Sequence, residues 1–344
     1  MGKKKMKKAG ILSMQRIYNY GSFLQAYALK KMMEECGAEV EFVDYHPGEC
    51  ILPSKETTGM KRKIQKGLEI LRMKGRLRDK IQFVKYKKNY ARKNYPVLGL
   101  KETYNYAPKL DLLVIGSDEV FNCIQDNSNV GFAPELFGAG HQANRLISYA
   151  ASFGNTTLES LKKYQVADQV AQWLRAFDAL SVRDENSRKI VQELTGKDPV
   201  CHLDPVLAYD YPAKLPETKA KIPHDPYMIR CGDKFIDCSP FEIFEYFKHA
   251  ESVVTDTFHG TIFSVVTQKK FATFVRKNGY GNSEKLTDLL KRLGLERQIV
   301  TDTKKLGKIL NLTVAYEPVM EKIKRERQRT YSYLKEMTGH GAEE

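Results

Sequence analysis

The sequence has no long hydrophobic run and no cysteine pair at metal-site spacing. None of its apolar stretches approaches the roughly 20 consecutive residues that a membrane-spanning helix needs. The opening residues, MGKKKMKKAGILS, pass from lysines into a short strand-like run, which argues against a secretory signal. The cysteines are far apart and lack CxxC spacing, so we expect free thiols in a cytoplasmic protein. They are Cys36, Cys50, Cys123, Cys201, Cys231 and Cys238.

Internal repeats and low-complexity tracts are absent as well, and the length points to more than one domain. A chain of 344 residues exceeds what one hydrophobic core usually serves. With 42% apolar residues, the chain can bury a sizeable core. We therefore expect two globular domains.

Positive charge is concentrated in one segment of a chain whose formal net charge is +14. Residues 60–95 hold fourteen Lys or Arg against two acids, so this segment contributes 14 − 2 = +12. Apolar residues recur there at three- and four-residue spacing in two sets, which predicts a basic amphipathic helical hairpin inserted at 59–95. The sets are Ile64, Leu68 and Leu71, then Leu77, Ile81 and Val84, with Gly75 between them.

This basic hairpin has two interpretations. It is a solvated helix face, or it is a surface for polyanions, diphosphate-linked substrates or anionic lipid at the inner face of a membrane. Tyr86, Tyr90 and Tyr95 add rings that can stack on sugars or bases. Because the charge is confined to one hairpin and no nucleic-acid motif is present, nucleic acid is not an expected partner.

Strand-like and helix-like segments alternate, which predicts an α/β fold with parallel sheets covered by helices. The first part, residues 1–209, reads as an N-terminal Rossmann-like lobe, and the Pro-rich stretch 210–225 reads as a linker. Its expected strands are 8–13, 39–45, 111–117, 145–152, 179–184 and 200–207, and its expected helices are 21–37, about 158–174 and 185–196.

The alternation restarts after the linker on a smaller scale, which predicts a smaller Rossmann-like lobe at 226–315. This second lobe is short, because only CGDKFIDCS separates the strand PYMIR from the helix at 240–250. Further strands are expected at 252–256 and 270–276, and a helix at 282–294. A final charged helix, 316–338, is long enough to pack back on the first lobe.

The strongest local signal is VVTDTFHGTIFSVV, where an apolar strand ends and a helix begins near His259, Gly260 and Thr261. Ligands bind at such turns in open α/β sheets. Free backbone N–H groups and the helix dipole there attract phosphate and carboxylate. His259 is therefore a candidate site residue; the alternative is that it caps the helix or satisfies a hydrogen bond in the core.

SVRDENS repeats this strand-to-helix arrangement in the first half of the chain. Arg183 stands at the end of a strand, and Asp184 or Asn186 is placed to cap the next helix. A guanidinium suits bidentate binding of phosphate or carboxylate. The ordinary alternative is a structural salt bridge from Arg183 to Asp184 or Asp204.

Two further turns carry small or polar residues just past an apolar strand. They are Gly116, Ser117 and Asp118 in LLVIGSDEVFN, and Asn19, Gly21 and Ser22 in NYGSFLQAYAL. Small residues let a ligand approach the backbone closely, although the second turn lacks a full GxGxxG pattern. Asp118 can bind a sugar hydroxyl, act as a base, or cap a helix.

Together these segments resemble the polysaccharide pyruvyl transferase family over most of the chain, and their order and spacing are more specific than any one motif. The segments are NYGSFLQAYAL (19–29), VIGSDEVFN (114–122), ISYAASFG (147–154), SVRDENS (181–187), LDPVL (203–207) and VVTDTFHGTIFS (253–264). The resemblance implies transfer of a pyruvyl ketal group from phosphoenolpyruvate to a sugar of a cell-surface polysaccharide or of its lipid-linked precursor. It implies no other cofactor and no metal.

The resemblance also implies two Rossmann-like lobes in a GT-B-like arrangement that hold phosphoenolpyruvate between them. It places Arg183 and His259 on the donor from opposite lobes, with Lys277 as a second anion clamp. His259 then serves as acid or phosphate ligand, and Asp118 as acceptor-side base. The helix start at Gly260 and Thr261 belongs to the donor side; the acceptor-side or anion-binding residues are Asn19, Gly21, Ser22, Gly116 and Ser117.

The chain departs from the family at two points. Thr257 stands where many relatives have an arginine two residues before the histidine, and the second lobe is shortened. Two other functions share the same features. One is a GT-B-type glycosyltransferase that uses a nucleotide sugar, and the other is a basic binding protein with a degenerate active site.

Overall fold

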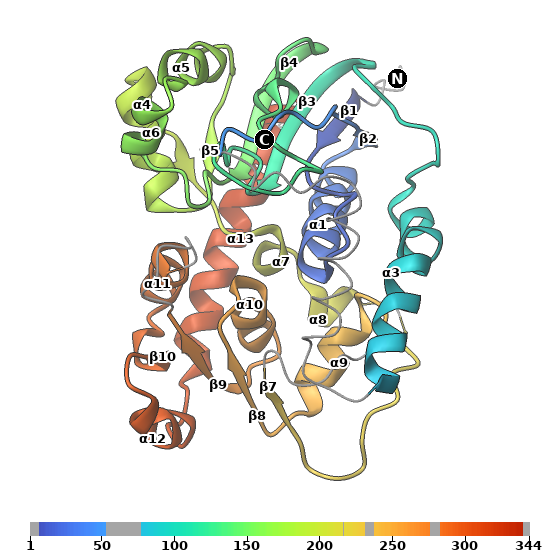
Figure 1. The fold of residues 1–344 in the computed structure, drawn as a ribbon, viewed down its shortest axis with the longest axis vertical. Helices are drawn as coiled ribbons and strands as arrows, with labels where there is room; N and C mark the ends of the chain where they lie inside the picture. Colours follow the sequence, from blue (N-terminus) through green and yellow to red (C-terminus); the bar gives the residue numbers. More distant parts are fainter. Residues whose placement is uncertain (1–6, 53–76, 216, 231–236, 276–282, 340–344) are drawn as a thin grey trace, which may run out of the picture.

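The computed structural model describes residues 7–52, 77–215, 217–230, 237–275 and 283–339. Two sheets of parallel strands, one in each half of the chain, lie one above the other with helices packed on them (Figure 1). This is the two-lobed, GT-B-like α/β fold that the sequence predicts, with the second lobe the smaller one. No helix within these ranges is long and apolar enough to cross a membrane.

The first sheet has six strands in the order β2-β1-β3-β4-β5-β6. Its two longest strands, β3 and β4, lie in the middle, where the register partners Val114 and Ile147 are fully buried. Helices on both faces explain why these strands are nearly continuous apolar runs. The bounds are β1 Lys7–Leu12, β2 Ala38–Val43, β3 Lys109–Asp118, β4 Gln142–Ala151, β5 Ser181–Val182 and β6 Val200–Cys201.

Most helices of the first lobe lie where the sequence predicts them, with one exception. The expected helix from about 158 to 174 is wrong, because the chain breaks at Gln165, whose φ of 56° no helix accommodates. At the next helix Asp184, rather than Asn186, is the cap and accepts the N–H of Ser187 at 2.9 Å. The bounds are α1 Tyr20–Glu35, α4 Leu158–Lys163, α5 Ala167–Arg175 and α6 Glu185–Thr195.

The chain leaves the first sheet through two short helices, so the expected strand to residue 207 is wrong. Helix α7 (Pro205–Ala208) begins after Asp204, whose side chain accepts the N–H of Val206 at 2.9 Å. Aspartate before proline favours a helix start. At the start of α8 (Tyr211–Lys214), Tyr211 is fully buried and donates to the carbonyl of Leu24 at 2.6 Å. The first residues of the expected linker thus belong to the core.

The second sheet has four strands in the order β10-β9-β8-β7. Its strands are β7 Met228–Arg230, β8 Ser252–Thr255, β9 Lys270–Phe274 and β10 Ile299–Val300. The helices around it are α9 Glu242–His249, α10 Phe258–Val266, α11 Ser283–Leu293 and α12 Leu306–Leu310. The sequence did not predict β10 or α12, which are too short to show a periodic pattern.

Helix α13 (Tyr316–Thr338) runs from the second lobe back to the first, as the sequence predicts (Figure 1). Tyr333 donates its hydroxyl to the carbonyl of Ser148 in β4 at 2.9 Å. The hydroxyls of Thr330 and Tyr149 lie 3.1 Å apart. Leu334 is fully buried in the same core as strands β1 and β3.

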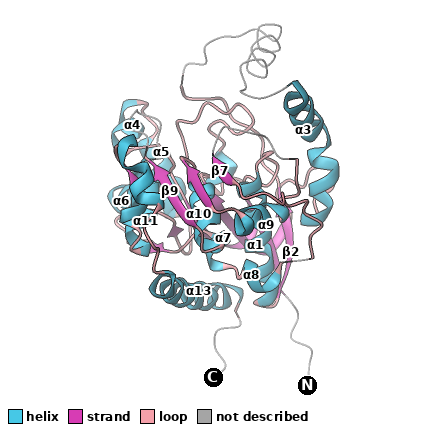
Figure 2. Cartoon of the chain, turned by 90° about the horizontal axis from the view of Figure 1, so that it is seen from below, coloured by secondary structure: helices cyan, strands magenta, loops and turns pink. Residues whose placement is uncertain are grey.

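Helix α3 (Leu77–Leu98) is the described part of the basic hairpin and lies on the opposite side of the molecule from α13 (Figure 2). The expected apolar face is wrong, because Ile81 and Val84 are 48% and 46% exposed. Tyr86 and Tyr90 are buried instead, so their rings are not available to stack on a ligand. The other expected helix, within 60–76, lies outside the described residues.

Candidate active site

His259 lies in the first turn of α10, directly after strand β8. Thr257 caps this helix, because its Oγ1 accepts the N–H of Gly260 at 3.0 Å. A β-carbon on Gly260 would stand 2.2 Å from Oγ1 of Thr255, so only glycine fits there. Thr261 is fully buried and donates to the carbonyl of Thr257 at 3.1 Å. These neighbours fix the position from which the imidazole projects.

Helix α1 of the first lobe brings its own N-terminus to His259. Asn19 caps α1 by accepting the N–H of Gly21 at 2.7 Å. A β-carbon on Gly21 would stand 2.2 Å from Nδ1 of His259. Because Gly21 has no side chain, the N-terminus of α1 can lie against the N-terminus of α10. The two helix starts therefore form one site.

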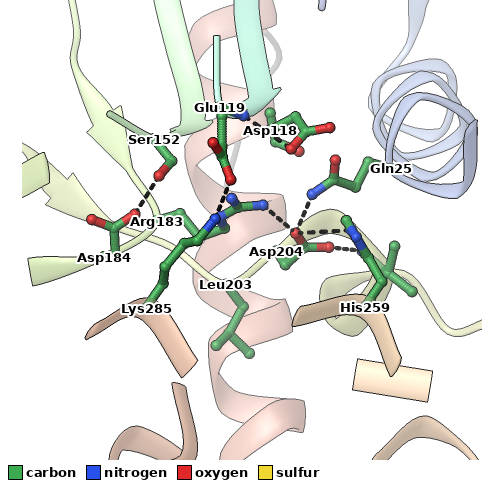
Figure 3. Close-up of polar contacts among 12 residues, drawn as sticks. Gln25, Asp118, Glu119, Ser152, Arg183, Asp184, Leu203, Asp204, His259 and Lys285 are labelled. Carbon is green, nitrogen blue, oxygen red and sulfur yellow. Dashed lines mark hydrogen bonds and ion pairs between the residues drawn. The ribbon is translucent and has the colours of Figure 1, made fainter. Parts of the chain in front are cut away.

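A buried carboxylate, Asp204, joins Arg183 to His259 (Figure 3). Its Oδ2 accepts from Nη1 of Arg183 at 2.8 Å and lies 3.9 Å from Nε2 of His259. Gln25 of α1 donates to the same oxygen. Because the side chains of Arg183 and Asp204 are only 4% and 0% exposed, this is an interior ion pair.

Arg183 therefore forms the salt bridge that the sequence left open as one of its two roles. Its partner is Asp204, whereas Asp184 accepts from Oγ of Ser152 at 2.6 Å. The guanidinium and the imidazole of His259, which come from opposite lobes, nevertheless converge on one carboxylate. Within the described ranges, Nε of Arg183 and Nε2 of His259 are both buried without a hydrogen-bond partner. Buried polar atoms of this kind are rare in folded proteins and call for an explanation.

The electrostatics of the site favour the neutral form of His259. Burial lowers the pKa of His259 below its usual value of 6.5, and the negative charges of Asp204 and Asp118 offset this only in part. The neighbouring cations Arg183 and Lys285 lower the pKa further. A bound anion would act in the opposite direction and favour the protonated imidazole.

A second ion pair, between Lys285 and Glu119, crosses from one lobe to the other beside this cluster (Figure 3). Lys285 projects from α11, and its side chain is 5% exposed, against 29% for Glu119. Both Lys285 and Arg183 approach the ring of Phe258, at 5.9 and 4.4 Å from its centroid. Two cations thus lie on one aromatic ring next to His259.

Asp118, at the end of β3, lies on the first-lobe side of the same cluster. Its Oδ2 accepts from Oγ of Ser22 at 2.7 Å, and its Oδ1 accepts the N–H of Glu119 at 2.9 Å. Gly116 allows close strand packing, since a β-carbon there would stand 2.3 Å from the carbonyl oxygen of Tyr149. Ser117 is 1% exposed, whereas the side chain of Asp118 is partly exposed.

The structure brings most of the residues that the sequence singled out into one region. Lys277 lies outside the described residues. Four further residues of the cluster were missed as site residues: Gln25, Glu119, Asp204 and Lys285. Only Asp204 had a usable signal, the Asp-Pro pair of LDPVL. The described residues contain no group of three or more metal-ligating side chains.

Comparisons with solved structures give weak likenesses spanning nearly the whole chain. An O-GlcNAc transferase from Thermobaculum terrenum is 11% identical, with a TM-score of 0.39, over 98% of this chain and 66% of that one. This chain thus spans slightly less than two thirds of that protein. The glycosyltransferase SnogD from Streptomyces nogalater is 10% identical, with a TM-score of 0.40, over 98% and 100%. Similarities this low add nothing to what the two sheets already show.

Comparison with protein families identifies the family of this chain, which the structural similarities do not. No curated protein matches the chain. A family model described as "Polysaccharide pyruvyl transferase" matches residues 19–278, which include parts of both lobes and every described residue of the site except Lys285. The match covers well over half of the sequence, and the chain therefore belongs to the polysaccharide pyruvyl transferase family.

Proposed function

We propose that this protein forms a pyruvyl ketal, moving the pyruvyl group of phosphoenolpyruvate to a sugar of a cell-surface polysaccharide or of its lipid-linked precursor, in the cytoplasm. The observation that carries the proposal is the convergence of Arg183 and His259 from opposite lobes, each with a buried, unpartnered nitrogen among the described residues. Phosphate and carboxylate oxygens are suitable partners for both. A small anion with both groups can reach the two residues at once.

Binding such an anion requires an exchange of partners within the site. Arg183 is paired with Asp204 and lies near three further carboxylates, Asp118, Asp184 and Glu119. Lys285 is paired with Glu119. The donor therefore competes with Asp204 for the guanidinium and with Glu119 for the ammonium group. Lys277 stays a proposed third cation, on the family resemblance alone.

The reaction adds two sugar oxygens to one donor carbon. A first hydroxyl attacks the carbon that bears phosphate, the methylene carbon takes a proton from protonated His259, and Asp118 accepts the hydroxyl proton. Phosphate then leaves with its bridging oxygen and takes the proton held by Asp118. A second hydroxyl bonds to the same carbon to close the ketal ring, and its proton passes to the now neutral His259. Cations near the phosphate favour the charge that develops on the leaving group.

Because the pKa of His259 is lowered, binding of the donor is coupled to uptake of a proton by the imidazole. The surroundings of the imidazole favour its neutral form, and the negative charge of a bound donor raises its pKa. We therefore expect donor affinity to rise as pH falls through the neutral range. Calorimetry in two buffers of different ionisation enthalpy measures the protons taken up.

The decisive experiment compares thermal unfolding with phosphoenolpyruvate, with a nucleotide sugar and with buffer. Phosphoenolpyruvate should raise the melting temperature by mass action, and His259→Gln should lose most of this rise. His249→Gln is the matched control, because that imidazole is 47% exposed on α9. Stabilisation by the nucleotide sugar and not by phosphoenolpyruvate would overturn the proposal in favour of a glycosyltransferase.

A further inference from the structure

A large cavity opens beside the candidate active site, at the carboxyl ends of β1 and β2. Its volume is about 1040 Å³, at the upper end of the range for small-molecule sites. Residues 15–18 after β1, residues 44, 45 and 47 after β2 and residues 127 and 129 after β3 contribute to its walls, together with α3. Ligands bind at this edge of open parallel sheets.

Tyrosine side chains dominate the lining of this cavity, to which Tyr18, Tyr45, Tyr95, Tyr104 and Tyr106 all contribute. Tyr104 and Tyr106 are stacked, with ring centroids 5.6 Å apart and planes at 6°. They are also 59% and 43% exposed, so both rings are accessible to a ligand. Within the described ranges, their hydroxyls have no hydrogen-bond partner. The wall thus offers apolar ring surface and unused hydroxyls together.

Charged neighbours hold this aromatic wall in place. Arg16 forms two hydrogen bonds to Asp44, at 2.6 and 2.9 Å, and its guanidinium lies 4.4 Å from the centroid of Tyr104. Asp44 is 5% exposed and also accepts the N–H of Asn105 at 2.9 Å, which ties the loop of the tyrosines to the end of β2. The two charges neutralise each other, so this pair adds no net charge to the wall. Lys87 of α3, which also lines the cavity, donates to the carbonyl of Tyr18 at 3.3 Å.

One wall of the cavity, residues 15–18, leads along the chain to the turn that holds Asp118. Residues 15–18 run directly into Asn19 and the start of α1, where Ser22 holds Asp118. The negative charge of Asp118 contributes to the raised pKa of Tyr45, although burial is the main cause. A molecule that lies along the tyrosines can therefore present one end to the proposed base.

We propose that this cavity, with Tyr104 and Tyr106 as its wall, binds the acceptor as an uncharged oligosaccharide segment. Each pyranose has a face rich in C–H groups that packs on an aromatic ring, and its hydroxyls form hydrogen bonds with polar side chains. Asn127 and Asn129 line the cavity and supply amide groups for such bonds. The volume exceeds what one sugar fills, so the site selects an extended saccharide. This inference rests on the proposed function, since it places the saccharide's reactive hydroxyls at Asp118.

The test is a printed array of neutral di- to tetrasaccharides probed with the full chain. Tyr104→Ala and Tyr106→Ala should weaken binding of the saccharides that the wild type selects by about tenfold each. Tyr164→Ala, a partly exposed tyrosine after α4, is the control and should bind as the wild type does. Thermal unfolding verifies that each variant folds.

Donor binding is measured separately, so that the two proposals fail in different ways. Unchanged stabilisation by phosphoenolpyruvate in Tyr104→Ala and Tyr106→Ala, with weaker saccharide binding, supports the inference. Equal saccharide binding by wild type and both variants overturns it, and so does an array on which the wild type binds nothing. Absence of any phosphoenolpyruvate effect on the wild type refutes the proposed function instead.

Discussion

Gly21 and His259 lie so close that a β-carbon on Gly21 would stand 2.2 Å from Nδ1 of the imidazole. Gly21→Ala must therefore push the ring or the start of α1 aside. Helix propensity alone would favour alanine, so a loss of stability of about 1–3 kcal/mol reports the clash. We expect turnover to fall more than tenfold, measured as phosphate release from phosphoenolpyruvate.

Gly307→Ala is the control for this substitution, because a β-carbon at that position of α12 meets nothing within 4 Å. It should keep activity and leave stability equal or slightly higher. If Gly21→Ala behaved like Gly307→Ala, the imidazole would not occupy the place described here.

Asp204→Asn tests the interior ion pair. The substitution leaves the 4% exposed guanidinium of Arg183 without its carboxylate, and breaking a buried pair from one side costs about 3–5 kcal/mol. Chemical denaturation measures the loss. Asp198→Asn removes the carboxylate from the exposed pair with Arg188 and should change stability little. Equal effects of the two substitutions would contradict an interior location for Asp204.

Glu119→Gln separates stability from donor binding. Lys285 loses its charged partner and stays buried, so the free energy of unfolding should fall. Affinity for phosphoenolpyruvate should rise about three- to tenfold, because the donor no longer competes with a carboxylate. Isothermal calorimetry measures the affinity for phosphoenolpyruvate, and chemical denaturation measures the free energy of unfolding. Glu35→Gln, on the surface of α1, is the control for both. A weaker affinity would mean that Glu119 positions Lys285 rather than competing for it.

His202 gives the protein an acid-sensitive core. Its ring is 1% exposed, stacks on Tyr149 and has Oγ of Ser181 2.7 Å from Nδ1. Burial lowers its pKa to about 4, from an ordinary value of 6.5. Because the folded value is the lower one, the stabilising contribution is complete above pH 6.5 and is lost as pH falls toward 4. The difference between the two pKa values, 6.5 − 4 = 2.5, corresponds to a contribution of ~3 kcal/mol to the free energy of unfolding.

Urea denaturation between pH 4 and pH 7.5 measures this contribution. His202→Asn keeps a polar atom near the position of Nδ1 but does not titrate, so its stability should fall less steeply between pH 6.5 and pH 4 than that of the wild type. The surface variant His249→Asn should follow the wild type. Parallel curves for His202→Asn and wild type would show that this ring does not titrate with unfolding.

The sequence predicts most of the fold because buried parallel strands appear as continuous apolar runs, with turn-forming residues such as glycine and proline between them. The strand at 111–117 and the helix at 21–37 are each correct to within two residues. The prediction was wrong where a structural feature has no recurring sequence pattern that announces it. Gln165 adopts a left-handed conformation that nothing in its type indicates, and the apolar residues Ile81 and Val84 face solvent because the tyrosines four residues apart on α3 occupy the buried side.

The sequence predicts the individual strand-to-helix turns of the candidate site, but not the contacts between residues of different turns. Arg183 and His259 each follow an apolar strand, which is a local signal. The contact from Asp204 to Gln25 joins residues 179 positions apart, and Lys285 meets Glu119 across 166 positions. The first contact depends on how α1 packs within the first lobe and the second on how the two lobes dock, and no window of sequence contains either arrangement.

The return of α13 to the first lobe has a consequence for biosynthesis. Leu334 and Met337 share one core with Ala9 and Ile11 of the first strand. While a ribosome makes the chain, the lobe that emerges first lacks these side chains until the other lobe has also been made. We therefore do not expect the two lobes to fold independently, one after the other. We expect newly made chains to depend on chaperones until α13 emerges, and the two lobes to unfold together as one cooperative unit.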